Sequence, residues 1–327
     1  MKKRIDFLDY LKAIAIMLVI TTHYDWIDKK QYVFTMFINM AVPIFLIVSG
    51  YNYAMSYDKK TDGTLKQMYK PKIIWAKLER IIIPALVAST VELILFKVRG
   101  LDFDWVNLYL NGGYGPGSYY VPLMVQLILM FPLIYIIMKV NPWYGLISIG
   151  IANLLYESWV VWSQIEKSSY RLSIGRYLLL IAFGCYMYMY PQKKLKWWIL
   201  APAFLYGLYC QKYYLHNWPE MELFPYWRPT AIFIAFYICP IIVILFRIFY
   251  HSHIKGFVGD LLVLISKASY HIFLFQMIYY RFKLAGSIMD TEWYIAIPIN
   301  MVITIPVGIL LYKGENWIRA QIKVWRK

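Results

Sequence analysis

The sequence predicts an all-α polytopic membrane protein with about ten transmembrane helices. The chain has 327 residues, of which 61% are hydrophobic and only 16% are charged. A soluble globular protein carries about 45–50% apolar and about 25% charged residues. Apolar stretches of about 20 residues, the length that a helix needs to cross the hydrocarbon core, also recur along the whole chain. These observations exclude a soluble enzyme, a disordered chain and a disulfide-stapled secreted module.

The charge balance supports the same class and predicts an orientation. Lys and Arg number 34 against 18 Asp and Glu, which gives a formal net charge of +16. In water this excess would suggest nucleic acid, but Lys and Arg also collect in the cytoplasmic loops of membrane proteins. With the N-terminus inside, about 21 basic residues fall in inner segments and about 11 in outer ones. We therefore expect cytoplasmic termini, one transmembrane domain over residues 1–327, membrane lipids as neighbours and no nucleic-acid partner.

The predicted spans follow the apolar runs in chain order. The first run begins directly after a basic start. Asp9 and Lys12 interrupt it and no small-residue cleavage site follows, which favours a mature helix over a signal peptide. The sixth and seventh runs are short and interrupted. The predicted spans are residues 8–27, 33–56, 73–96, 119–138, 143–162, 174–190, 197–212, 230–250, 257–280 and 293–312.

The cysteines do not indicate a metal site. Cys185, Cys210 and Cys239 stand singly inside apolar runs. Because their spacing fits no metal-binding pattern, we expect buried free thiols and no bound metal ion.

The most telling set of ionisable residues in the first span is Asp9, Lys12 and His23. Each ionisable side chain at membrane depth costs at least about 2.5–3.5 kcal/mol, so it needs a reason. Lys12 and His23 are separated by about three full turns and share a helix face, about 16 Å apart, with Asp9 one turn before Lys12 and able to pair with it. Snorkelling of Lys12 and an interfacial position of His23 are the alternatives for each residue singly. As a set they favour function, because an imidazole can take a proton from a hydroxyl and return it to a leaving group.

Other spans also carry ionisable residues. Glu92 lies in the third span and Glu157 in the fifth. Either residue could line a cavity, orient His23 or pair with Lys267, and the sequence leaves these alternatives open. His271, within the ninth span, is a candidate pore-lining residue.

A dense group of cations precedes and begins the third span: Lys72, Lys77 and Arg80. Positive-inside anchoring and attraction to anionic lipid explain such a group simply. A phosphate-binding mouth is the sharper interpretation, because Lys and Arg satisfy phosphate oxygens well. The spacing of Lys77 and Arg80 puts both side chains on one helix face, which favours the second interpretation.

These residues belong to short motifs that together resemble the integral-membrane acyltransferase-3 family. Members open with an Asp, a basic residue three positions later, and a His eleven positions after that. The resemblance covers nearly the whole chain in order. The matching segments are Asp9-Tyr10-Leu11-Lys12 with His23, residues 43–51 ending in Ser49-Gly50-Tyr51, residues 77–84, residues 117–126 with Phe131-Pro132-Leu133, and residues 266–276.

The chain departs from the family pattern at three positions. Lys12 replaces the usual Arg and lacks its bidentate fork. Gln276 stands where the family has a late His, which puts more of the expected chemistry on His23. Gln126 stands where many members carry Glu, so a charge is absent there.

The resemblance implies transfer of an acyl group, usually acetyl, from cytoplasmic acyl-CoA to a hydroxyl of a glycan outside a bacterial plasma membrane. His23 would be the general base. Lys12, with Asp9 as its partner, would hold a CoA phosphate or the geometry of the pore. The cationic group Lys72, Lys77 and Arg80 would bind the nucleotide phosphates. Weaker candidates for the pore or substrate site are Ser49, Tyr119, Tyr120, Gln126, Glu92 and His271.

Two other functions fit some of the same residues. A transporter or flippase of a lipid-linked sugar or small metabolite would also carry intramembrane charges and a basic inner surface. A ligand-binding relative that has lost catalysis would be consistent with Lys12 and Gln276. The sequence does not name the acceptor, the acyl group or the oligomeric state.

Overall fold

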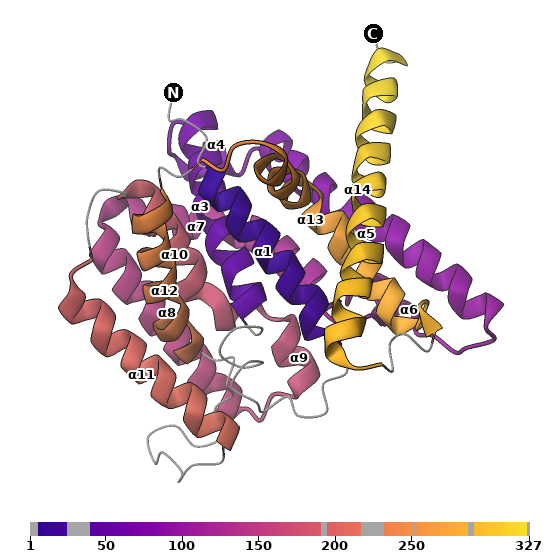
Figure 1. The fold of residues 1–327 in the computed structure, drawn as a ribbon. Coiled ribbons are helices and arrows are strands. Elements are labelled where there is room, and N and C mark those ends of the chain that lie inside the picture. The colour runs from indigo at the N-terminus through magenta and orange to yellow at the C-terminus, as the bar shows by residue number, and fades with distance from the viewer. Residues whose placement is uncertain are drawn as a thin grey trace. The chain divides into compact units, whose positions relative to one another are not determined.

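The computed structural model describes residues 6–24, 40–190, 195–216, 232–250, 253–286 and 291–325 (Figure 1). It is 83% helical, and no strand occurs in these ranges. The long helices are α1 (Asp6–Thr22), α3 (Ala41–Lys60), α5 (Pro71–Val98), α7 (Tyr120–Val140), α8 (Pro142–Trp162), α10 (Leu178–Met189), α11 (Trp197–His216), α12 (Phe233–Phe249), α13 (Phe257–Arg281) and α14 (Trp293–Trp325). Short helices are α4 (Leu65–Met68), α6 (Trp105–Tyr109), α9 (Lys167–Leu172) and the 3-10 helix η2 (Ile174–Tyr177).

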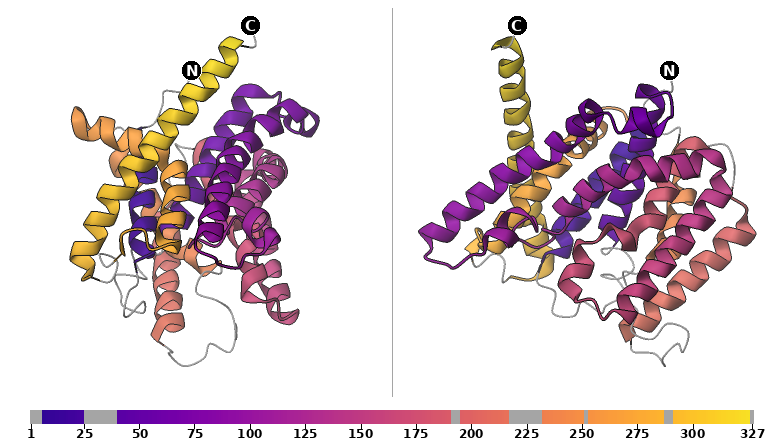
Figure 2. Two further views of the ribbon diagram at one scale, coloured as in Figure 1. Left: turned by 90° about the vertical axis from the view of Figure 1, so that its right-hand side faces the viewer. Right: turned by 180° about the vertical axis from the view of Figure 1, so that it is seen from behind.

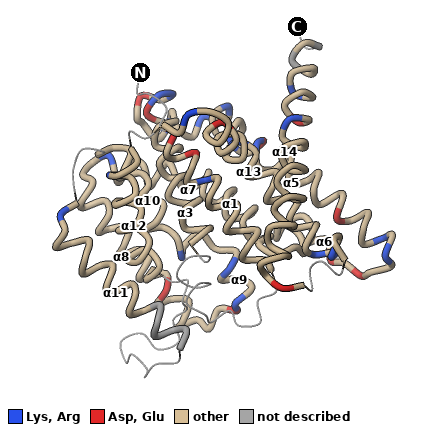
Figure 3. The backbone as a smooth tube through the Cα atoms, viewed as in Figure 1, with Lys and Arg blue, Asp and Glu red and all other residues tan. Residues whose placement is uncertain are grey.

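The helices confirm the predicted fold class. Each predicted span has one long helix at its place in the chain. In the described part of the chain, five helices are long and apolar enough to cross a membrane: α5, α7, α8, α13 and α14 up to Ile322. Figure 3 shows long stretches of helix without a charged residue. The chain is therefore an all-α polytopic membrane protein.

Some boundaries differ from the prediction. Residues 25–27, 33–39 and 230–231 of the predicted spans lie outside the described residues. Helix α14 continues to Trp325, beyond the predicted end at residue 312. Its last turns extend beyond the other helices of its unit (Figures 1 and 2) and are mostly exposed. Charged residues there, which include Glu315 and Arg319, explain why the apolar pattern ended earlier than the helix.

The chain divides into two compact units. The first comprises residues 1–29, 83–118 and 250–327, and the second comprises residues 30–82 and 119–249. The single transmembrane domain expected over residues 1–327 stays a prediction.

In the first unit α13 packs against both α1 and α14. Helices α13 and α1 run in the same direction. Ser266 contacts Asp9, and later in both segments Gln276 contacts His23. Helices α13 and α14 run in opposite directions. Tyr279 donates to Asn300, whereas His271, which comes earlier in α13, contacts Glu315, which comes later in α14. A parallel first and ninth span and an antiparallel ninth and tenth are what the predicted crossing order requires.

In the second unit the closest helix pair is α3 with α10. Two glycines bring the backbones together. A Cβ on Gly50 would lie 2.2 Å from the carbonyl oxygen of Ile181, and one on Gly184 would lie 2.0 Å from that of Ile47. Small residues at such positions let membrane helices approach closely. The Ser-Gly-aromatic motif of the second span thus has a packing role at its glycine.

The turn between α7 and α8 is set by its sequence. The side chain of Asn141 caps α8 by accepting hydrogen bonds from the backbone N–H groups of Trp143 and Tyr144, at 3.0 and 3.2 Å. Pro142 follows at the first helical position, where its missing N–H costs nothing. The two helices therefore form a hairpin with almost no loop.

Candidate functional site

His23 lies one residue beyond α1 and is held by α13. Its Nδ1 is 2.7 Å from Oε1 of Gln276, a residue that is fully buried. Because an amide oxygen only accepts, Nδ1 carries the proton in this hydrogen bond and Nε2 carries the acceptor lone pair. The ring of Tyr280 meets the imidazole edge-on, with centroids 6.0 Å apart. The contact with Gln276 Oε1 favours the tautomer with the proton on Nδ1, in which Nε2 is the basic nitrogen.

A glycine-rich loop reaches the basic edge of this imidazole. A Cβ on Gly117 would lie 3.2 Å from Cε1 and 3.5 Å from Nε2 of His23. Gly117 has φ +87° and Gly113 has φ +104°, backbone conformations that residues other than glycine rarely adopt. Glu92, only 2% exposed, holds the loop by accepting a hydrogen bond from the Tyr114 N–H at 3.1 Å. Thus Glu92 acts on the loop backbone, which in turn borders His23.

The acidic residue of the first span also contacts α13. The Ser266 hydroxyl donates to Asp9 Oδ1 at 2.6 Å. Both Asp9 and Lys12 are half-buried. Asp9 and His23 therefore meet the same partner helix, as their shared stripe on α1 predicts. The predicted pairing of Asp9 with Lys12 stays a prediction.

In the second unit Lys77 is held by α3. Its Nζ donates to the Ser56 hydroxyl at 3.0 Å and lies 4.6 and 4.5 Å from the ring centroids of Tyr53 and Tyr57. An ammonium has three donors, so this arrangement leaves capacity for a phosphate oxygen. Arg80 and Lys72 are exposed. The cationic group thus combines one fixed, half-buried charge with exposed ones.

A second polar cluster lies at the start of α10, around Arg176. The guanidinium is 4% exposed and lies 4.4, 5.1 and 5.3 Å from the ring centroids of Tyr177, Tyr119 and Tyr170. The Tyr170 hydroxyl donates to both carboxylate oxygens of Glu157, each at 3.1 Å. Burial, reinforced by this carboxylate, raises the pKa of Tyr170, which therefore stays a donor.

The weaker pore candidates of α3 and α7 have ordinary structural contacts. Gln126 donates to the Leu172 carbonyl at 2.7 Å and accepts from the Ile174 N–H at 3.0 Å, which fixes the backbone before Arg176. Ser49 is within hydrogen-bonding reach of Tyr120, whose ring packs against Phe45.

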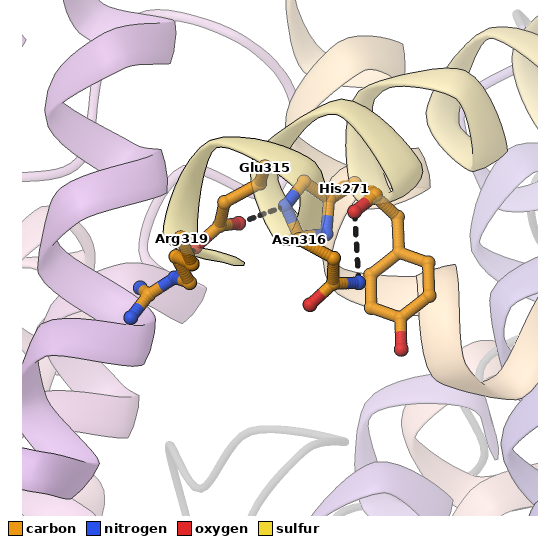
Figure 4. A network of polar contacts seen from close by, with 5 residues as sticks. His271, Glu315, Asn316 and Arg319 are labelled. Atoms are coloured by element: carbon orange, nitrogen blue, oxygen red, sulfur yellow. Dashed lines mark hydrogen bonds and ion pairs between the residues drawn. The ribbon is translucent and has the colours of Figure 1, made fainter. Parts of the chain in front are cut away.

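His271 faces α14 rather than α1 (Figure 4). Its Nε2 pairs with Glu315, whose other oxygen accepts from Arg319 Nε at 2.5 Å. His271 is five positions before Gln276, which turns it roughly 140° around the helix at about 100° per residue. The His271–Glu315–Arg319 network joins α13 to α14 and does not include His23.

One comparison with known proteins decides the family. A family model described as an acyltransferase domain, acyltransferase-3, matches residues 5–313. The chain belongs to the acyltransferase-3 family. No curated protein and no solved structure matches it. The match confirms the resemblance read from the motifs, and the protein is a multi-pass membrane acyltransferase.

The structure of this acyltransferase adds residues that sequence reasoning missed. Gln276 was noted only as a departure from the family, yet it is the hydrogen-bond partner of His23. Arg176 lies inside the predicted span 174–190, and an ionisable residue there is itself a signal of function. In the described ranges no group of three or more His, Cys, Asp or Glu side chains could hold a metal ion.

Proposed function

We propose that this membrane acyltransferase moves an acetyl group from cytoplasmic acetyl-CoA to a hydroxyl of a glycan at the outer face of a bacterial plasma membrane, with His23 as general base. The observation that carries the proposal is the hydrogen bond between His23 Nδ1 and Gln276. It favours the tautomer with a basic Nε2, on the edge bordered by the glycine loop. A base must lie within hydrogen-bond reach of the proton that it removes. Gly117 adds no side chain at this edge of the imidazole.

The reaction needs one proton to move twice. His23 Nε2 takes the proton of the acceptor hydroxyl while the hydroxyl oxygen attacks the thioester carbon. The tetrahedral intermediate collapses, the carbon–sulfur bond breaks, and the imidazolium returns the proton to the thiolate of CoA. No oxidant, reductant or metal is required, and the products are the ester and free CoA.

Donor binding is assigned to the cationic group. Lys77 is already oriented by Ser56 and two tyrosine rings, so a phosphate oxygen would meet a preorganised ammonium. Arg80 and Lys72, which are exposed, would add charge at the same end of α5. Lys12 and Asp9 would stabilise the polar face of α1 along which the acyl arm extends.

A radiolabelled acetyl group distinguishes acyl transfer from transport. Purified protein is given radiolabelled acetyl-CoA and a polysaccharide acceptor, and the polymer is then freed of nucleotide and counted. We expect label in the polymer. Movement of acceptor or nucleotide across vesicles without any labelled ester would contradict the proposal and favour a transporter.

The donor site is tested by Arg80→Ala against Lys97→Ala, an exposed cation near the other end of the same helix. Because a charge-assisted hydrogen bond is lost, Arg80→Ala should weaken acetyl-CoA binding about tenfold or more, while acceptor binding stays unchanged. Lys97→Ala should leave both affinities unchanged. Equal losses for donor and acceptor in Arg80→Ala would instead indicate a lipid-anchoring role.

A further inference from the structure

Arg176 is a buried cation whose position is fixed from several sides. Gln126 holds the backbone on both sides of Ser173, and the Ser173 side chain accepts from the Gly175 N–H at 3.2 Å. Asn153 Oδ1 accepts from the Leu179 N–H at 3.2 Å, just after η2. A Cβ on Gly175 would lie 2.6 Å from the ring of Tyr156, so the turn packs tightly there. The guanidinium is thus preorganised, as binding sites require.

The surroundings of the guanidinium satisfy its faces but leave its Nε donor without an acceptor among the described residues. Tyr119, Tyr170 and Tyr177 surround it as aromatic rings, and ring contacts stabilise the charge through the faces. The N–H donors of a guanidinium lie in its plane and need acceptors there. Within the described part of the chain, Nε is fully buried and has no acceptor. The nearby carboxylate of Glu157 accepts from Tyr170.

An oxyanion fits this edge by charge and geometry. Carboxylates and phosphates accept two parallel hydrogen bonds from the guanidinium fork, which is the reason for arginine at such sites. A buried donor without an acceptor costs more free energy than a hydrogen bond contributes. A ligand that supplies the acceptor removes this cost and binds more tightly as a result. We propose that Arg176, in its cage of Tyr119, Tyr170 and Tyr177, binds an anionic carboxylate or phosphate group of the acceptor.

That the bound anionic group belongs to the acyl acceptor rests on the proposed function. In the predicted orientation the C-terminal end of α8 and the start of η2 and α10 face outward, where an acceptor glycan would be. The chemistry then narrows the acceptor to an anionic polymer, with either uronic acid or phosphodiester groups. A neutral glycan could offer a hydroxyl oxygen as acceptor, but neither the negative charge nor the two parallel acceptors that suit a guanidinium.

Binding is measured on the purified full chain without any acyl donor. The probes are inorganic phosphate, glucuronate and neutral glucose, compared at ionic strength matched with chloride. We expect phosphate or glucuronate, but not glucose, to raise the melting temperature, and the more effective of the two identifies the anionic group. Arg176→Gln should lose this response, and Arg176→Lys, which keeps the charge without the fork, should bind about tenfold or more weakly. The matched control is Arg171→Gln, an exposed arginine on α9, which should respond like wild type.

Two results would overturn the anion site. One is an equal response of wild type to anions and glucose. The other is an unchanged anion response in Arg176→Gln or, if that variant does not fold, in Arg176→Lys, which would make Arg176 a purely structural cation. His23→Ala should keep the anion response. Wild-type protein that binds the anions but transfers no acyl group would contradict the proposed function and not this site.

Discussion

At the scale of single residues, the proposed chemistry depends on the contact between Gln276 and His23. Gln276→Leu removes the acceptor at Nδ1 and with it the preference for the tautomer with a basic Nε2. Residues that orient a metal-binding histidine typically contribute about 10–100-fold, and we take the same order for a histidine that acts as a base. We expect Gln276→Leu to lower kcat by about that factor while KM for acetyl-CoA changes little. Gln276→Glu keeps an oxygen acceptor and should restore most of the rate.

The measurement is steady-state label transfer for wild type and both variants. Gln276→Leu and Gln276→Glu have side chains close in size to glutamine, so packing alone predicts similar losses for the two. Rescue by Glu but not by Leu supports positioning through Nδ1. If both variants match wild type in kcat, Gln276 has no positioning role.

The sequence predicted single residues unevenly. His23 and Asp9 are visible in the sequence because an ionisable residue in an apolar run stands out, and Lys77 is visible because it belongs to a dense group of cations. Their partners are not, since Gln276, Ser266 and Ser56 come from helices distant in the chain and carry no charge. The role of Glu92 was left open for the same reason, since its partner is a backbone N–H.

At the scale of helices, glycine contacts decide packing. Gly184→Ala adds a Cβ to a backbone contact between α10 and α3 that leaves no room for it, and overpacking typically costs about 1–3 kcal/mol. The control is Gly314→Ala on α14, where nothing lies within 4 Å of the added Cβ. Alanine there should be neutral or stabilise the helix by up to about 1 kcal/mol.

Thermal unfolding of the purified variants in one detergent compares the two. The melting temperature should fall for Gly184→Ala and stay or rise for Gly314→Ala. A fall of equal size in both would show that the close approach of α3 and α10 does not limit stability.

The helices themselves were predictable because hydrophobic length is a local property. Every predicted span has a helix, and most described ends differ by a few residues. The largest miss is the end of α14, where the helix continues after the apolar run stops. The sixth span begins as η2, a turn whose Ile174 N–H donates to Gln126 Oε1 and which is not visible in hydropathy.

At the scale of the whole molecule, the order of crossings connects structure to reaction. The parallel contact of α1 with α13 and the antiparallel contact of α13 with α14 agree with the predicted alternation of spans. In the predicted orientation His23 follows the outer end of the first span, whereas Lys77 and Arg80 begin the third at its inner end. Donor and acceptor should therefore be required on opposite sides of the membrane.

The most direct test of the account is acyl transfer across sealed proteoliposomes. Labelled acetyl-CoA is enclosed inside, an anionic polysaccharide is added outside, and ester formation is counted for wild type and His23→Ala on vesicles of known protein orientation. We predict labelled polymer with wild type and a rate about 10²–10⁴-fold lower with His23→Ala, while acetyl-CoA binding is retained. Transfer at the wild-type rate by His23→Ala would contradict the account.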